Sequence, residues 1–289
     1  MAASDDVPGG RAEQGGRMSR VHAAVRLPAL QWRPDGETSE PIERVAPEEV
    51  AVGISYDSEP YAVLMATPAD VADLAWGFTI TERIAEAGDI VEVRVSDHDE
   101  GLVADVLLTT AGARRARERR RRNLEGRSSC GLCGVQSPED ATRTLPVLAD
   151  GLVLHPAAIQ AALKALAMQQ TLGQETRATH AAAWASAEGR VLLVREDVGR
   201  HNALDKVIGA ALRSGLDPAQ AFAVVTSRCS YEMVEKSAVA GLSAIVAISA
   251  PTALAVRKAE AANMTLVALA RDDGHLVFAG AHRIRRSAD

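Results

Sequence analysis

The C-terminal part of the sequence alternates short apolar segments with amphipathic ones, and this rhythm constrains the fold more than any other feature. Segments 222–226, 244–249 and 266–270 are short and rich in Val, Ile, Leu and Ala, which predicts strands. Helical patterns follow the first two, over 231–240 and 252–263. Strands that alternate with helices at this spacing form a largely parallel sheet covered on both faces. We therefore expect an α/β fold.

Other segments predict an additional part and a mixed sheet. Strands 180–186 and 190–194, joined at Glu188–Gly189, read as an antiparallel hairpin. Before them, Thr67-Pro68-Ala69-Asp70 is typical of a helix start, with Thr67 as the N-cap. We divide the chain into four parts: a flexible N-terminal tail (1–42), an α+β region (43–110), a basic segment with a cysteine-pair loop and a helix (111–173), and an α/β core (174–289).

Composition narrows the functional classes. The 289 residues are 47% apolar and carry a net charge of −6. The negative charge argues against a protein whose whole surface binds nucleic acid. No run of 18 apolar residues occurs, so we expect no membrane span. Three cysteines in a chain this long do not form a secreted disulfide framework, and the N-terminus has no apolar core of a signal peptide. We expect a cytoplasmic protein.

The motif Cys130-Gly131-Leu132-Cys133 is the first candidate for chemistry. Its flanking serines and glycines favour an exposed loop, and nearby arginines lower the pKa that controls the thiolate population. Such a pair exchanges disulfides, holds a metal or carries sulfur as a persulfide. Zinc needs four ligands, and the sequence offers no second ligand pair unless Cys229 and a histidine are recruited. We expect no tightly bound metal.

Seven arginines between Arg114 and Arg122 precede the cysteine pair. A charge run of this kind is usually the solvated face of a helix. Its place beside the thiols also suits a docking surface for an acidic or phosphate-rich partner. The sequence leaves both interpretations open.

Polar clusters follow three consecutive strands, at 195–206, 226–232 and 249–252. The carboxyl ends of parallel strands share one sheet edge, where helix N-termini offer free N–H groups to anions. Arg200, Arg228 and Lys206 add positive charge there. The sequence thus indicates a phosphate-bearing ligand such as a nucleotide, although no dinucleotide fingerprint or Walker A motif is present. The plainer alternative is that these residues cap helices and line exposed faces, and we expect Cys229 to be a buried bystander.

Several of these strings together resemble one family. They are Ser129-Cys130-Gly131-Leu132-Cys133-Gly134, His180-Ala181-Ala182-Ala183, Glu196-Asp197-Val198-Gly199-Arg200-His201-Asn202-Ala203-Leu204-Asp205-Lys206, Ser227-Arg228, Ser230-Tyr231-Glu232-Met233-Val234 and Ser249-Ala250-Pro251-Thr252. From about residue 43 to 285 the chain resembles the FdhD family, the sulfur carrier proteins for formate dehydrogenase. The resemblance implies a cytidine-deaminase-like three-layer core with a mixed sheet and a smaller N-terminal α+β part. It also implies a homodimer.

The family resemblance further implies a function. Such proteins accept sulfur as a persulfide from a cysteine desulfurase and pass it to the bis-molybdopterin guanine dinucleotide cofactor, which formate dehydrogenase requires. The persulfide cysteine matches Cys130, and Cys133 is expected to assist release. The expected cofactor-binding residues are Leu269, Ala270, Arg271, Asp272, Asp273 and Gly274, together with Arg200, His201, Asn202 and Arg228. The expected partners are the desulfurase, formate dehydrogenase and this guanine-containing molybdenum cofactor.

The likeness to deaminases is one of fold alone. A zinc deaminase needs His-x-Glu and Pro-Cys-x-x-Cys, but Ser129 precedes the pair here, and the His-x-Glu at His98–Glu100 falls in a polar turn. Two alternatives to a sulfur carrier stay open: a thiol-disulfide oxidoreductase, and a molybdenum-cofactor chaperone without catalysis. Persulfide formation separates the carrier from the chaperone, and an insulin-reduction assay separates it from the oxidoreductase.

Overall fold

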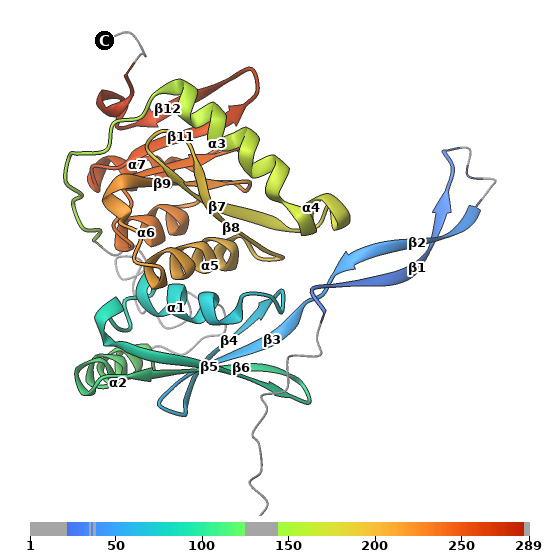
Figure 1. Cartoon of the computed structure of the whole chain (residues 1–289), viewed down its shortest axis with the longest axis horizontal. Helices are drawn as coiled ribbons and strands as arrows, with labels where there is room; N and C mark the ends of the chain where they lie inside the picture. The colour runs from blue at the N-terminus through green and yellow to red at the C-terminus, as the bar shows by residue number, and fades with distance from the viewer. Residues whose placement is uncertain (1–21, 35, 37–38, 125–143, 286–289) are drawn as a thin grey trace, which may run out of the picture.

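The computed structural model describes residues 22–34, 36, 39–124 and 144–285, and Figure 1 shows their arrangement. The larger sheet has the strand order β12-β11-β10-β9-β7-β8. Its strands are β7 (His180–Ser186), β8 (Val191–Asp197), β9 (Ala221–Val225), β10 (Ala244–Ala247), β11 (Thr265–Arg271) and β12 (Gly274–Ala279). Strands β9, β10 and β11 run parallel, whereas β7 and β12 pair antiparallel with their neighbours. The expected mixed α/β class is confirmed, and the cytidine-deaminase-like layering stays an expectation.

Helices cover both faces of this sheet. They are α3 (Pro156–Gln169), α5 (Arg200–Arg213), α6 (Tyr231–Val239) and α7 (Ala253–Ala261). Alternate side chains of each strand point to opposite faces, so Trp184 packs in the cluster beneath α5, α6 and α7, while Ala183 and Phe222 pack with α3. Small side chains dominate the strand faces, which lets the helices approach closely.

A smaller sheet lies beyond α5, in the order β4-β3-β6-β5. Its strands are β3 (Val50–Tyr56), β4 (Glu59–Ala66), β5 (Ile90–His98) and β6 (Gly101–Leu108), and its helices are α1 (Val71–Thr81) and α2 (Thr110–Leu124). Shorter elements are α4 (Thr171–Thr176) and the 3₁₀ turns Ala87–Asp89, Pro218–Gln220 and Ala281–Arg283. Helix α1 fills the space between the small sheet and α5 (Figure 1).

Helices α1 and α5 make backbone contact because each contributes a glycine to their crossing. A β-carbon on Gly77 of α1 would lie 1.8 Å from the carbonyl oxygen of Asp205, and one on Gly209 of α5 would lie 2.0 Å from that of Asp73. Neither distance is physically tolerable. The two glycines therefore fix how closely the N-terminal part of the chain sits on the α/β core.

Strands β1 (Ala24–Trp32) and β2 (Ser39–Pro47) form an antiparallel ribbon that stands away from the body (Figure 1). The expectation of a flexible tail through residue 42 is therefore wrong for residues 24–32 and 39–42. Proline and charged residues within these strands interrupt the alternation of apolar and polar residues by which a strand is predicted. The ribbon exposes large apolar side chains, with Leu30 and Trp32 63% and 62% accessible.

The start of α1 also differs from the sequence prediction. Asp70, with φ of 54°, is the residue before the first helical turn, and its side chain makes no capping hydrogen bond. Thr67 lies outside the helix because its backbone is held by the α/β core, as described below. Among the described residues, no helix combines the length and the apolar character needed to cross a bilayer.

We predict that Gly209→Ala lowers the free energy of unfolding by about 3 kcal/mol, because overpacking against the backbone of α1 forces the two helices apart. Urea denaturation measures the change. Gly88→Ala is the matched control, since a β-carbon there meets no atom within 4 Å. Equal stabilities for the two variants contradict the close approach of α1 and α5.

Candidate functional site

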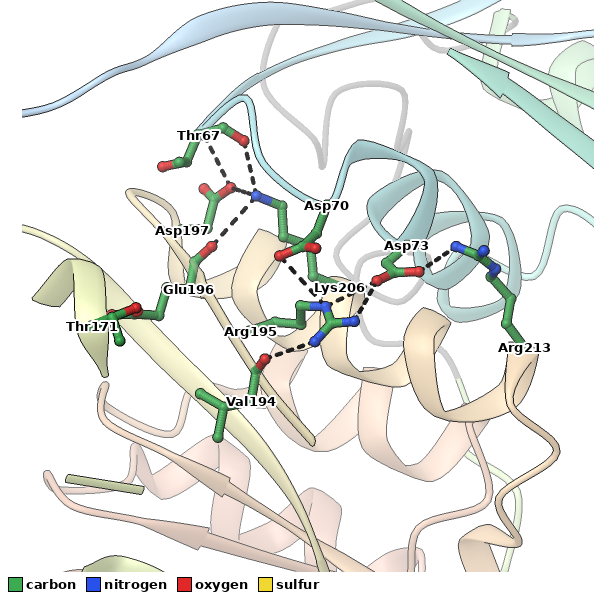
Figure 2. Close-up of polar contacts among 10 residues, drawn as sticks. All are labelled: Thr67, Asp70, Asp73, Thr171, Val194, Arg195, Glu196, Asp197, Lys206 and Arg213. Atoms are coloured by element: carbon green, nitrogen blue, oxygen red, sulfur yellow. Dashed lines mark hydrogen bonds and ion pairs between the residues drawn. The ribbon is translucent and has the colours of Figure 1, made fainter. Parts of the chain in front are cut away.

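Lys206 lies at the centre of a buried polar cluster that joins β8, α5 and the loop before α1 (Figure 2). Its side chain is 0% accessible, and Nζ lies 2.6 Å from Oδ2 of Asp197. Nζ also donates to the carbonyls of Thr67, at 2.9 Å, and Glu196, at 3.4 Å. Burial lowers the pKa of Lys206, and the Asp197 carboxylate opposes that shift. The ammonium is thus fully occupied by the protein.

Asp197 binds both sides of the same junction. Its Oδ2 accepts the backbone N–H of Thr67 at 3.0 Å, while Oδ1 accepts the N–H of Gly199 at 2.7 Å and the side-chain amide of Asn202 at 3.0 Å. Asn202 also donates to the carbonyl of Met65 at 2.8 Å. Lys206 is therefore corrected from a ligand contact to a structural group, because burial and these bonds remove it from solvent. The amide nitrogen of Asn202 is also occupied, and its expected cofactor contact stays a prediction.

A second junction places one carboxylate between two arginines. Asp73 of α1 is bonded by Arg195 of β8, with Nη2 2.8 Å from Oδ2, and by Arg213 of α5 (Figure 2). Arg195 also lies 3.5 Å from Asp70. Nearby, the carboxylate of Glu196 accepts the N–H groups of Leu172, at 2.9 Å, and Gly173, at 2.7 Å, in α4.

A third junction lies between α1 and α6. Lys236 Nζ lies 2.8 Å from Asp205 Oδ2, 2.9 Å from Glu82 Oε1 and 3.0 Å from Thr81 Oγ1. Burial opposes the charge on Lys236, yet the carboxylates of Asp205 and Glu82 outweigh it and raise the pKa of Lys236 above its ordinary value. Much of the segment 196–206 thus joins two parts of the chain.

The remaining polar residues gather where the sequence predicts, at the carboxyl-end edge of the large sheet. Strands β8, β9 and β10 run in the same direction and lead into α5, α6 and α7, so three helix N-termini lie along this edge. Two backbone hydrogen bonds join the loop after β9 to the loop after β10. Cys229 N–H donates to the carbonyl of Ala250 at 3.2 Å, and Thr252 N–H donates to that of Cys229 at 3.0 Å. The edge is therefore a fixed scaffold that carries the positive ends of three helix dipoles.

Four ionisable side chains meet at this edge. His201 of α5 has Nε2 2.9 Å from Oε2 of Glu232 of α6, and that contact lowers the pKa of the Glu232 carboxyl. Burial, followed by the charges of Arg200 and His201, lowers the pKa of His180 at the start of β7. His180 is consequently neutral at neutral pH, in a surrounding that already holds positive charge.

Two buried polar atoms here lack a hydrogen-bond partner among the described residues. They are Nε of Arg200 and Oγ of Ser230, the N-cap residue of α6. Arg228, two residues before Ser230 in the same loop, is exposed. Unsatisfied donors, arginines and helix N-termini together favour an anionic group. This edge, with Arg200, His201, Arg228 and Ser230, is the candidate binding site.

The stretch 269–274 reaches the same edge at the end of β11. Leu269 has φ of 50°, a left-handed conformation that is costly for a branched side chain, and its N–H donates to the Ser249 carbonyl at 3.2 Å. Ala270 is buried, whereas Arg271, Asp272 and Asp273 are exposed around the turn into Gly274. Strain at this position fits a site that shapes its backbone for a ligand.

Only one of the three cysteines lies among the described residues. Cys229 is buried, as expected, and burial raises the pKa of its thiol to about 12; its role as a bystander stays a prediction. Cys130 and Cys133 lie outside the described residues. Within the part of the chain that the structure describes, no cluster of three His, Cys, Asp or Glu side chains is arranged to hold a metal.

The sequence pointed to the edge but not to the groups that support it. Asp73, Thr81 and Lys236 were not singled out, because each is an ordinary surface residue type in an amphipathic segment, and Thr67 was predicted only as a helix N-cap. Their partners lie 122–155 residues away along the chain. Only the tertiary fold brings these partners together.

The family to which these features belong follows from sequence comparison. The model of the FdhD/NarQ family matches residues 47–285, and the chain therefore belongs to that family. The match covers both sheets and begins at the end of β2. Most of the β1–β2 ribbon lies before it.

Individual relatives agree with this assignment. The Sulfur carrier protein FdhD of Xanthomonas euvesicatoria is 46% identical over 86% of this chain and 89% of its own. That of Cupriavidus necator is 44% identical over 89% of each chain. A crystal structure of a formate dehydrogenase accessory protein from Desulfotalea psychrophila superposes with a TM-score of 0.73 at 23% identity, covering 91% of this chain and all of the other, and it supports the fold.

We predict that Lys206→Ala lowers the free energy of unfolding by about 3–5 kcal/mol, because it leaves the buried Asp197 carboxylate without a counter-charge. Urea denaturation measures this cost. The double variant Lys206→Met with Asp197→Leu should lose less than the single one, and Arg94→Ala, which breaks an exposed pair with Glu92, should change stability by less than ~0.5 kcal/mol. A Lys206→Ala variant as stable as Arg94→Ala rules out the proposed role of the pair.

Proposed function

We propose that this protein is a sulfur carrier that serves formate dehydrogenase. It accepts sulfur from a cysteine desulfurase as a persulfide on Cys130 and delivers it to the bis-molybdopterin guanine dinucleotide cofactor. The observation that carries this proposal is the similarity of at least 43% identity, over 84–89% of the chain, to proteins named Sulfur carrier protein FdhD. The cysteine pair at 130 and 133 supplies the thiols that such a role requires.

The first step is a sulfur exchange between thiols. The Cys130 thiolate attacks the terminal sulfur of the desulfurase persulfide, a new S–S bond forms, and the S–S bond of the donor breaks. The electron pair of the broken bond leaves with the donor cysteine as a thiolate. Arg127 and the arginines upstream favour the attacking thiolate electrostatically.

Release of the sulfur needs two electrons, and Cys133 can supply them. Its thiolate attacks the inner sulfur of the Cys130 persulfide, which forms a Cys130–Cys133 disulfide and expels the terminal sulfur as hydrosulfide for the cofactor substrate. A cellular dithiol must then reduce the disulfide before the next cycle. This assignment makes Cys130 essential for loading and Cys133 necessary for release.

The sheet edge suits the nucleotide ends of the proposed cofactor substrate. Phosphate oxygens fit the helix N-termini beside Arg200, Arg228 and Ser230, where polar donors are buried without partners among the described residues. Asp272 and Asp273 are exposed at the turn and leave the binding role of 269–274 to its backbone. We further propose that the working form is a homodimer.

Incubation with a cysteine desulfurase and cysteine should add one sulfur, about 32 Da, to the intact protein, because the thiolate takes up sulfane sulfur. Mass spectrometry detects the addition, which a reductant should remove. Cys130→Ala should lose it and fail to support formate dehydrogenase, while Cys229→Ala, which removes the buried thiol, should keep both. Persulfide on the Cys130→Ala variant overturns the assignment. Rapid insulin reduction without sulfur uptake favours an oxidoreductase instead.

GDP should bind to the sheet edge, and Arg228→Ala should weaken binding about tenfold because it removes a charge-assisted contact. Calorimetry measures the affinity, with Arg190→Ala at the opposite end of the sheet as the control. The affinity should rise as the pH falls below neutrality, since a bound phosphate favours protonated His180, whose pKa burial has lowered. Equal affinities for the two arginine variants, or a pH-independent affinity, contradict this site.

A further inference from the structure

A pocket of about 330 Å³ lies between α2 and the β3–β4 hairpin. We call it the tyrosine–arginine pocket. It is lined by Tyr56, Asp57, Glu59 and Tyr61 from the hairpin and by Ala113, Ala116, Arg117 and Arg120 from α2. Its volume falls within the range of small-molecule sites. Every lining residue belongs to the described part of the chain.

The pocket exists because of the pattern along α2. Positions 113, 116, 117 and 120 recur at helical spacing, so they lie on one face of the helix. Two of them are alanines, which leave space opposite the tyrosines, and two are arginines, which bring guanidinium groups to the rim. The arginine run that the sequence left ambiguous therefore contributes two side chains to a cavity.

Aromatic rings form one wall of the pocket. Tyr56 and Tyr61 meet edge to face with centroids 5.1 Å apart, and Tyr61 meets Phe78 at 6.4 Å. The chain has only nine aromatic residues, three each of Phe, Trp and Tyr, and three of them gather here. Burial raises the pKa of Tyr56 well above its ordinary value, and its hydroxyl pairs with Thr79 at 3.0 Å. Tyr56 therefore presents an uncharged ring.

The rim carries two guanidiniums and two carboxylates, and one of the guanidiniums has no charged partner among the described residues. Arg117 is exposed and forms no ion pair or hydrogen bond with any described residue. Arg120 Nη1 lies 3.2 Å from Glu59 Oε2, an exposed pair that a stronger anion can displace. Asp57 is occupied, since its Oδ1 accepts the Leu108 N–H at 3.1 Å. An incoming anion thus meets one free guanidinium and a second that it can recruit.

The wall formed by α2 is anchored on its other side. Arg115 lies 2.5 Å from the buried carboxylate of Asp89 through Nη2 and 3.0 Å through Nε. Asp89 also accepts the Thr109 hydroxyl at 3.1 Å, and a β-carbon on Gly112 would lie 2.7 Å from the Asp89 β-carbon. The helix is therefore held against the sheet, and the pocket is preformed rather than induced.

We propose that the tyrosine–arginine pocket binds a small aromatic anion, a planar ring that carries a phosphate or a carboxylate. The ring packs against Tyr56, Tyr61 and the two alanines, while the anionic group binds Arg117 and draws Arg120 away from Glu59. Neither half suffices alone, because an exposed guanidinium binds a free anion weakly and the aromatic wall gives no orientation. None of its lining residues belongs to the candidate binding site at the sheet edge.

Titration of the full chain with phenyl phosphate, followed by calorimetry, tests this proposal. Arg117→Ala should weaken binding at least tenfold, and Ala113→Leu should abolish it by filling the space beside the rings. Glu59→Gln should tighten binding severalfold, because it frees Arg120 and removes a negative charge. Arg190→Ala, which removes an exposed arginine elsewhere, should change nothing. If Arg117 and Glu59 had only structural roles, Arg117→Ala would not weaken binding while Glu59→Gln tightens it.

The other ligands separate the contributions of ring and charge. Benzoate binding as tightly as phenyl phosphate identifies a carboxylate site, and weaker binding identifies a phosphate site. Inorganic phosphate binding as tightly as phenyl phosphate overturns the proposal, because the rings then contribute nothing. It is also overturned if no ligand saturates, or if Arg117→Ala and Ala113→Leu both bind like the unmodified protein.

Discussion

The buried ion pair of Lys206 and Asp197 is the interaction on which the rest of the structure depends. A charge removed from water is tolerable only when a counter-charge and hydrogen bonds replace the lost solvation. Asp197 meets that requirement with Lys206, Asn202 and the Thr67 N–H, and Lys206 adds two backbone carbonyls. Since Thr67 of the N-terminal part completes the hydrogen bonds of a charge pair in the α/β core, the pair also holds the two parts together.

This arrangement also positions the candidate site. Along the first turns of α5, Asn202 and Lys206 point into the junction, whereas Arg200 and His201 remain partly accessible at the sheet edge. Asn202 and Lys206 fix the start of α5. Arg200 and His201 are therefore held in a defined position beside Glu232 and Ser230. One short segment thus combines a structural role with a binding role, which explains why it carries so many polar residues between two buried elements.

Much of the fold could be predicted from the sequence, because apolar periodicity reports local structure. The strands 180–186, 222–226 and 266–270 and the helix 231–240 were predicted within a few residues. The shared edge of β8, β9 and β10 followed from their alternation with helices. The burial of Lys206 could not be predicted in this way, because a lysine on an amphipathic helix is ordinarily exposed. The left-handed Leu269 gave no signal either, since leucine is not a residue that usually adopts that conformation.

The great sequence separation of the junction partners has a consequence for how the chain folds. Thr67 is hydrogen-bonded to Asp197, Thr81 to Asp205, and Asp73 to Arg195. These partners lie 122–130 residues further along the chain. During synthesis the small sheet and α1 therefore emerge long before the groups that neutralise their inner surface. The loop-closure entropy of such distant contacts makes docking a late event. Until α5 has been made, the N-terminal part lacks the partners of Thr67, Asp73 and Thr81.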